Sequence, residues 1–214
     1  MAAITIMGAG GKMGYRLSRN LKDSGHDMHY VEVSEAGRAR LVELGLQASA
    51  AERAVAASDV VILAVPDRLI GRISHDIDPL LRPGTMVVAL DPAAPFAGEL
   101  PKRPDVTYFV SHPCHPPIVN DEVDPEAKRD FFGGVAAKQA IVCALMQGPE
   151  EHYGKGEGIA RQMYAPVLRS HRVTVQQMAI LEPALSETVT ATCITVLHEA
   201  MEEAVRRLKQ WRWL

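Results

Sequence analysis

The chain has few residues of the kinds that mark several protein classes. Its three cysteines, Cys114, Cys143 and Cys193, form no CxxC motif and no pair spacing, which argues against a disulfide scaffold and favours a reducing cytoplasm. The formal net charge is -3, so no basic field attracts a phosphate backbone and we expect no nucleic-acid partner. We find no signal peptide and no apolar run of the roughly 18 residues that a membrane span needs, and therefore expect a soluble, cytoplasmic protein.

The remaining composition is that of an ordinary globular protein. A chain of 214 residues with 47% hydrophobic and 23% charged side chains can bury the core of one large domain and part of a second. With slight acidity and no basic patch, a small molecule is the expected ligand.

Short apolar runs alternate with amphipathic segments over the first four fifths of the sequence. Strands are predicted at residues 2–7, 28–33, 59–66, 85–90, 106–111 and 138–148. The run 59–66 is apolar on both faces, as is typical of a strand inside a parallel sheet that helices cover. Helical stretches between the strands imply right-handed crossovers, so residues 1–172 are predicted to form an α/β, Rossmann-type, doubly wound parallel sheet.

The end of the chain predicts a long helix. Thr174 and Gln177 fit an N-cap with a capping box. Pro183 cannot donate a hydrogen bond inside a helix, so a kink is expected beside Glu182. We assign residues 173–214 to a C-terminal helical segment.

A glycine-rich stretch, GAGGKMG, follows the first predicted strand and opens the first helix. Gly8 and Gly10 permit the tight turn and the close backbone approach that a pyrophosphate requires, and the helix beginning near Gly11 offers its N–H groups to the anion. Met13 stands where the usual fingerprint has a third glycine, and Gly11 and Gly14 supply the small residues instead, so the match is a variant of the fingerprint. The context of strand, turn and helix predicts dinucleotide binding.

The choice of cofactor depends on Glu32, at the end of the second predicted strand. Its carboxylate can accept hydrogen bonds from the adenosine ribose and would repel a 2′-phosphate, so we expect NAD rather than NADP. The presence of Lys12 argues against this choice of NAD over NADP. Both Glu32 and Lys12 have a simpler interpretation as solvated side chains. Val65, Pro66 and Asp67 leave the third strand at the expected switch point and are predicted to line the nicotinamide side, with the alternative that Asp67 only caps the next helix.

The stretch SHPCHPPIVNDE begins where the fifth predicted strand ends, near the expected place of the reactive cofactor ring. Here His112 and His115 can ligate a divalent metal ion, or one can polarise a carbonyl or carry a proton. The simpler alternative is a hydrogen bond to backbone in a rigid, proline-rich loop. Glu182 and Ser186 share one face of the predicted long helix, and Glu182 is the candidate carboxylate for this site unless it is a solvated side chain.

Several long stretches carry a family resemblance: GAGGKMG, AVPDRLIG, LDPAAPFAGELP, HPCHPP, DFFGG, ALMQGPEEHY and MAILEPALSETV. Together they resemble the D-apionate oxidoisomerase family, which is related to ketol-acid reductoisomerases and 6-phosphogluconate-dehydrogenase-like enzymes. The resemblance covers nearly all of the chain up to about Arg206. It implies an NAD-linked oxidation of a branched sugar acid coupled to migration of a hydroxymethyl group, which gives 3-oxo-isoapionate.

This chemistry assigns roles to the candidate residues. A shift between adjacent oxygen-bearing carbons builds alkoxide charge that a divalent ion stabilises. By position, His112 and Glu182 are the expected metal ligands, and His115 is either a third ligand or a proton carrier. Both His115 and Glu182 are expected to be catalytic. His115, Asn120 and Ser186 are the expected substrate contacts.

The resemblance stops before RRLKQWRWL, whereas family members continue into more of a helical domain. The apolar face of the long helix then needs another surface, and we expect a homodimer. Two other functions stay open. One is a metal-independent dehydrogenase of the prephenate-dehydrogenase type, in which His112 polarises the substrate, and the other is an NAD-binding protein without turnover.

Overall fold

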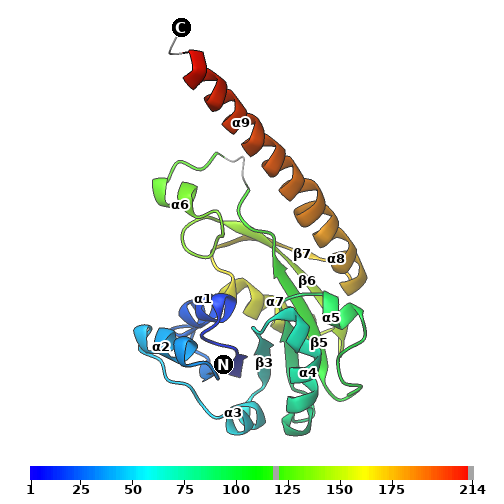
Figure 1. The fold of residues 1–214 in the computed structure, drawn as a ribbon. Helices are drawn as coiled ribbons and strands as arrows, with labels where there is room; N and C mark the ends of the chain where they lie inside the picture. The colour runs from blue at the N-terminus through cyan, green and yellow to red at the C-terminus, as the bar shows by residue number, and fades with distance from the viewer. Residues whose placement is uncertain (118–120, 212–214) are drawn as a thin grey trace. The chain divides into compact units, whose positions relative to one another are not determined.

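The computed structural model describes residues 1–117 and 121–211, so Asn120 lies outside the described residues. The chain divides into two compact units, Met1–Val175 and Gln176–Leu214. Figure 1 shows the path of the chain in each of them.

The first unit is built on one seven-stranded sheet with the order β2-β1-β3-β4-β5-β6-β7 (Figure 1). Its strands are β1 (Ala3–Met7), β2 (Asp27–Val31), β3 (Val60–Leu63), β4 (Met86–Ala89), β5 (Thr107–Pro113), β6 (Gln139–Gln147) and β7 (Val167–Arg172). The predicted α/β Rossmann-type fold is confirmed. One pair differs from a fully parallel sheet, because β5 and β6 are antiparallel while the other neighbours are parallel. A parallel neighbour needs a crossover across the sheet, whereas the described residues between β5 and β6 hold only a short helix.

Helices cover both faces of the sheet. They are α1 (Lys12–Leu21), α2 (Glu35–Glu43), α3 (Ala51–Ala57), α4 (Asp67–Ile77), the 3₁₀-helix η1 (Asp78–Leu80), α5 (Ala93–Phe96), α6 (Pro125–Arg129) and α7 (His152–Met163). Alternate residues of β3 enter different cores. Ile62 packs in the core that α1, α2 and α7 complete, and Leu63 packs in the core that α3, α4 and α5 complete. This double burial explains the continuous apolar runs of the sequence.

The strand order places a switch point beside β1. The chain passes from β1 to β2 on one side and then returns to β3 on the other side. Crossovers that leave in opposite directions open a crevice at the carboxyl ends of these strands, which is where ligands bind in open α/β sheets.

Strand β5 is longer than predicted. The expected strand ended at residue 111, but β5 runs to Pro113, with His112 opposite Val142 of β6. Pairing with an antiparallel neighbour extends the strand past the point where the sequence turns polar. His112 is therefore held by a strand rather than by a loop.

The second unit is one continuous helical segment. It consists of α8 (Val175–Glu182), the π-helix η2 (Pro183–Thr190) and α9 (Ala191–Trp211). The irregularity expected beside Glu182 takes the form of this π-helix. Pro183 supplies no N–H for the α-helical pattern, and single π-turns inside α-helices are frequent at functional sites.

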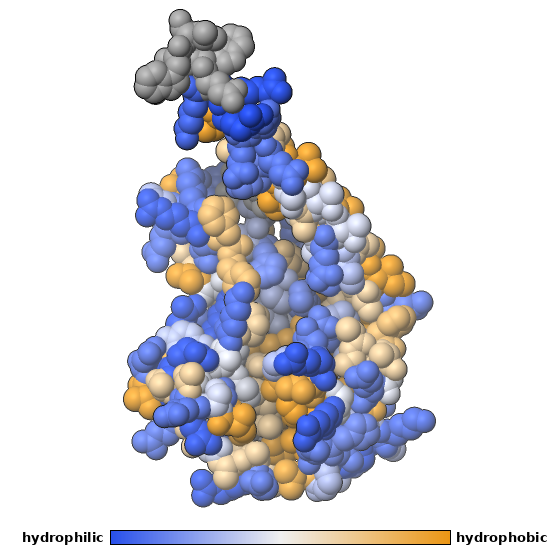
Figure 2. All heavy atoms as spheres, viewed as in Figure 1, coloured by the Kyte–Doolittle hydropathy of each residue, from blue (hydrophilic) through white to orange (hydrophobic). Residues whose placement is uncertain are grey.

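Within the described residues, one helix passes a length and composition test for a membrane span. Residues 175–209 contain a window with a mean hydropathy of 1.3, none of it buried. The expectation that no run is long and apolar enough was therefore wrong for this segment, in which small and β-branched residues raise the mean without an unbroken apolar run. One such helix is weak evidence for a span. Figure 2 shows apolar side chains on its surface, and those that are exposed include Leu181, Leu185, Val189, Val196, Leu197, Met201 and Leu208.

Packing of α7 on the sheet predicts that replacing two glycines of that helix by alanine changes the free energy of unfolding in opposite directions. A Cβ on Gly156 would lie 2.6 Å from the ring of the fully buried Phe109, whereas a Cβ on Gly158 would meet nothing within 4 Å. We expect Gly156→Ala to lower the free energy of unfolding by about 1–3 kcal/mol through overpacking. Gly158→Ala should raise it by about 0.5–1 kcal/mol because alanine favours a helix. Urea unfolding of both variants measures this, and equal shifts would contradict the described packing.

Candidate functional site

The loop after β1 makes a tight turn at the carboxyl edge of the sheet. Gly8 has φ of 75°, a conformation that glycine adopts without strain. The N–H groups of Gly8 and Ala9 donate to the carbonyl of Val31 at 2.9 and 3.0 Å, and the N–H of Gly11 donates to the carbonyl of Gly8 at 2.9 Å. Helix α1 begins directly after this turn, with Gly11 as its N-cap.

Other glycines let backbone segments touch in this loop. A Cβ on Gly10 would lie 2.2 Å from the carbonyl oxygen of Gly37, and one on Gly14 would lie 1.9 Å from the carbonyl oxygen of Gly8. Neither position accepts a side chain without displacing backbone. Gly14 thus permits the close packing of loop and helix that a third fingerprint glycine permits, and the first N–H groups of α1 have no acceptor within the helix, as at the N-terminus of any α-helix.

Glu32 is buried next to this loop, with 8% of the residue exposed. Its Oε2 accepts from the N–H of Gly10 at 2.9 Å, and its Oε1 accepts from the N–H and hydroxyl of Ser34 at 2.8 and 2.9 Å. Burial raises the pKa of Glu32, but the hydrogen bonds from Ser34 and Gly10 outweigh it and lower the pKa overall. The carboxylate is therefore ionised and integrated into the loop, so the alternative of a solvated side chain is wrong.

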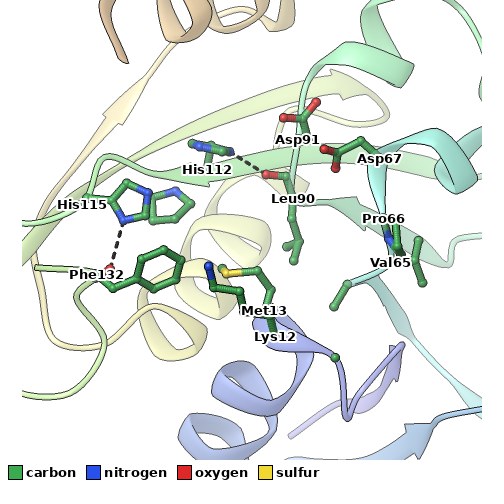
Figure 3. A pocket seen from close by; sticks show the side chains of 13 residues that line it. Lys12, Met13, Val65, Pro66, Asp67, Leu90, Asp91, His112, His115 and Phe132 are labelled. Atoms are coloured by element: carbon green, nitrogen blue, oxygen red, sulfur yellow. Dashed lines mark hydrogen bonds between the residues drawn. The ribbon is translucent and has the colours of Figure 1, made fainter. Parts of the chain in front are cut away.

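A cavity of about 400 Å³ lies beyond the glycine turn, at the carboxyl ends of β1, β3, β4 and β5 (Figure 3). It brings together many of the residues that the sequence singled out. Its lining consists of Gly11, Lys12, Met13, Ala64, Val65, Pro66, Asp67, Leu90, Asp91, His112, Pro113, His115 and Phe132. Gly8 and Gly10 belong to the loop that precedes this lining.

The hydrogen bond of His112 assigns its tautomer. Its Nδ1 lies 2.8 Å from the carbonyl oxygen of Leu90, and a carbonyl only accepts, so in this contact Nδ1 carries the proton. In the neutral ring Nε2 then holds the lone pair. A histidine that ligates a metal through one ring nitrogen commonly donates its other N–H to a carbonyl, as Nδ1 of His112 does here. The same arrangement suits a histidine that accepts a proton at Nε2.

His115 lies in an unusual backbone conformation. Its φ of 59° is the only positive value of a non-glycine residue among the described residues, and this conformation costs about 1–2 kcal/mol. Its Nδ1 donates to the carbonyl of Phe132 at 3.0 Å, and the two rings lie 4.9 Å apart. On its N-terminal side, the N–H of Cys114 donates to the carbonyl of Ala140 at 2.9 Å. These contacts offset the strain, and such strain is typical of functional sites.

Two carboxylates from the segments that follow β3 and β4 also reach the cavity (Figure 3). Asp67 is the first residue of α4, whose N-cap is Pro66, so the alternative of Asp67 as the cap is wrong. Burial and the nearby carboxylate of Asp91 raise the pKa of Asp67, and His112 partly opposes this rise. Sequence reasoning missed Asp91, although it directly follows a buried strand, which is the signal that identified Asp67.

Other candidates are not part of this cavity lining. Glu182 and Ser186 belong to the second unit, and Asn120 lies outside the described residues. Among residues 1–117 and 121–211, no group of three or more histidine, cysteine, aspartate or glutamate side chains is arranged to hold a metal ion. Phe132 was also missed, because nothing in its local sequence indicates that it contacts α1 and His115.

Two family models match different parts of the chain. Residues 2–92 match the family described as acetohydroxy acid isomeroreductase, NADPH-binding domain. Residues 120–209 match the family described as phosphogluconate dehydrogenase (decarboxylating) C-term.

Full-length relatives are more similar. Two proteins named D-apionate oxidoisomerase are 62% identical over 205 residues (Cupriavidus necator; 95% of this chain and 74% of the relative) and 61% identical over 208 residues (Rhizobium rhizogenes; 97% and 76%). A crystal structure of a semialdehyde dehydrogenase NAD-binding protein from Cupriavidus necator, in complex with calcium and NAD, is 62% identical with a TM-score of 0.92. This chain covers 75% of it, and the match spans 97% of this chain. The chain thus spans about three quarters of the length of these relatives.

The hydrogen bonds of Glu32 predict that wild type is more stable than a Glu32→Gln variant, by an amount that depends on pH. Its pKa is lowered from the ordinary value of 4.5 in the folded state. The ionised Glu32 therefore stabilises the folded state above pH 4.5, the pKa of the unfolded chain, and this stabilisation is lost as the pH falls through the lower pKa of the folded state. Glu32→Gln places an amide N–H₂ against the N–H of Gly10 or Ser34, and we expect a loss of about 1.5–3 kcal/mol at pH 7.

The stability difference between wild type and Glu32→Gln should narrow as the pH falls below 4.5, because the carboxyl of the unfolded chain binds a proton there before the folded one does. Urea unfolding between pH 7 and pH 3.5 measures it, with Glu52→Gln on the exposed side of α3 as the control. Equal stabilities of wild type and Glu32→Gln at pH 7 would contradict an ionised, hydrogen-bonded Glu32.

Proposed function

Since the chain belongs to the D-apionate oxidoisomerase family and is an NAD-dependent oxidoisomerase, we propose that it converts D-apionate to 3-oxo-isoapionate with the assistance of a divalent metal ion. The observation that carries this proposal is the cavity in which His112 and His115 lie beyond the start of α1. Two basic side chains of assigned tautomer next to a dinucleotide loop fit an oxidation of a carbon–oxygen centre.

Residues of the glycine loop fit NAD. Gly8 and Gly10 leave room for a pyrophosphate, α1 directs its first N–H groups at it, and Lys12 adds a positive charge at the same end. Glu32 supports NAD over NADP, because its ionised carboxylate lies at the end of β2 and would repel a 2′-phosphate. The NAD complex of the related Cupriavidus necator protein supports the same choice, although one matching family is described as NADPH-binding.

The chain's own residues provide proton handling and positioning. When bound, NAD removes two electrons and one hydrogen from the carbon that is oxidised. We assign His115 to accept the hydroxyl proton, because its Nδ1 is bonded to the carbonyl of Phe132 and Nε2 is left as the basic nitrogen. Val65, Pro66 and Asp67 form the opposite wall, where they position the reacting ring. Asn120 and Ser186 are proposed as contacts to substrate hydroxyls.

His112 is proposed as a metal ligand, and Glu182 stays the candidate carboxylate ligand that the sequence indicates. The carbonyl of Leu90 fixes the His112 tautomer in which Nε2 can ligate, so the donor chemistry of this residue fits an ion. A divalent ion would stabilise alkoxide charge during the carbon shift. The calcium in the related crystal structure supports a cation site in the family fold.

Metal dependence and the role of His112 are tested together. We expect the purified protein to form NADH from D-apionate and NAD, to lose this activity on chelation and to regain it with added divalent ions. His112→Ala should lower kcat/KM by at least about 100-fold, as is typical for loss of a metal ligand or a general base. His75→Ala, on an exposed part of α4, is the matched control and should retain the wild-type rate.

Each alternative gives a different result. NADH formation that resists chelation but is lost in His112→Ala favours the metal-independent dehydrogenase. Measurable NAD binding without NADH under any ion favours a binding protein or another substrate.

We propose that the protein is a cytoplasmic homodimer. The exposed apolar side chains of the second unit support the dimer. Its helices expose a series of large apolar side chains, including Leu185, Val189 and Leu197 at 56%, 54% and 64% exposure. Apolar surface of this extent is unfavourable in water, and a second copy of the same helix offers a complementary apolar surface. The dehydrogenase fold of the relatives supports a soluble protein.

Light scattering after gel filtration tests this assembly. We expect twice the chain mass for wild type without detergent, and a shift to the monomer mass for Leu197→Glu, because a buried charge disrupts an apolar interface. Glu199→Gln is the control and should leave the mass unchanged. A stable wild-type monomer in buffer, or recovery only with detergent, would contradict the dimer.

A further inference from the structure

Residues 130–137, which we call the Phe132 loop, are attached to helix α1 by two arginines. Arg16 donates through Nη2 to the carbonyl of Phe132 at 2.8 Å, and Arg19 donates to the carbonyl of Gly134. Arg16 is 6% exposed, so this anchor is buried. The same helix that opens the dinucleotide site therefore carries the loop.

The loop also has its own internal support. Asp130 Oδ2 accepts from the N–H groups of Val135, Ala136 and Ala137 at 2.9, 2.9 and 3.1 Å. Gly134 has φ of 80°, and a Cβ there would lie 2.0 Å from Nε of Arg16. The hydrogen bonds that hold the path of the loop thus all involve its backbone groups, and none of them involves the ring of Phe132.

The Phe132 ring contacts two basic groups that line the cavity (Figure 3), and the guanidinium of the anchoring Arg16 also lies over it, 5.0 Å from its centroid. The Lys12 Nζ lies over the ring, 4.4 Å from its centroid, and the His115 ring lies 4.9 Å away at an interplanar angle of 42°. Lys12 comes from the start of α1 and His115 from the segment after β5. Phe132 is the residue that both of them share.

Each contact restricts a group that would otherwise move. A lysine has a long flexible side chain whose ammonium is attracted to the face of an aromatic ring. The tilted ring pair prefers a defined geometry and limits rotation of the His115 imidazole, which the carbonyl of Phe132 already holds at Nδ1. One residue therefore orients an ammonium and an imidazole towards the same cavity.

We propose that Phe132 is a positioning residue of the oxidoisomerase reaction, whose ring holds the Lys12 ammonium and the His115 imidazole in place in the cavity. This assignment rests on the proposed function for the substrate that the cavity receives. Phe132 itself is 42% exposed, and its neighbour Phe131 is 74% exposed and outside the cavity lining. Phe131 and Phe132 can therefore be compared directly, because the ring of Phe132 contacts Lys12 and His115 and Phe131 lies outside the cavity lining.

The kinetic test uses Phe132→Leu and Phe132→Met as ring-free variants, Phe132→Tyr as the conservative variant and Phe131→Leu as the control. Without the ring we expect kcat/KM for D-apionate to fall about tenfold. The Kd of NAD should change less than about threefold, because the backbone N–H groups of the glycine loop and Glu32 hold the dinucleotide and Lys12 keeps its charge when the ring is removed. Phe132→Tyr should restore the rate, and Phe131→Leu should match wild type.

A second measurement does not depend on turnover. The Hε1 proton of His115, assigned by its loss in His115→Ala, experiences the ring current of Phe132 in the NMR spectrum. We expect this resonance to shift in both ring-free variants, with unchanged unfolding temperatures, and to stay in place in Phe131→Leu. Wild type that does not oxidise D-apionate would contradict the proposed function alone. An unmoved His115 resonance in the ring-free variants, or kinetics equal to wild type in an active enzyme, would overturn the positioning role.

Discussion

Close packing of peptide groups around Gly10 determines where the elements of the cavity lie. The backbone of Gly10 meets that of Gly37 at a distance that excludes any Cβ, and its N–H is held by the carboxylate of Glu32. This contact joins the first turn to the start of α2 and so places the N-terminus of α1. The same carboxylate that supports NAD selection is thus a structural part of the loop, so cofactor preference and loop geometry cannot vary independently.

Helix α1 connects the glycine loop to two other parts of the structure, the core of the sheet and the segment around Phe132. Leu17 and Leu21 are fully buried in the core of the sheet. Lys12, Arg16 and Arg19 are spaced so that they share another side of the helix, and all three contact the segment around Phe132. A helix that begins in the dinucleotide loop therefore also positions the wall of the cavity. The physical coupling between the two consists of hydrogen bonds and ring contacts within one rigid element.

The fold could be predicted because its signals are local. Apolar runs such as 59–66, a glycine turn after the first strand and the acidic Glu32 after the second each follow from the nearby sequence. The antiparallel β6 and the extension of β5 through His112 depend on which segments meet, and no local pattern encodes that. The contacts of Phe132 fall in the same class, since Lys12 and His115 reach it from distant parts of the chain.

Both cavity histidines have the same arrangement although different elements hold them. His112 donates its Nδ1 proton to the carbonyl of Leu90, and His115 donates its Nδ1 proton to the carbonyl of Phe132. Each backbone acceptor selects the tautomer in which Nε2 carries the lone pair. A neutral imidazole of this kind can take a proton or ligate an ion, whereas a protonated one can do neither. The backbone thus gives both imidazoles of the cavity the same tautomer, the one that the proposed proton transfer and ion binding need, and the carboxylates of Asp67 and Asp91 line the same cavity.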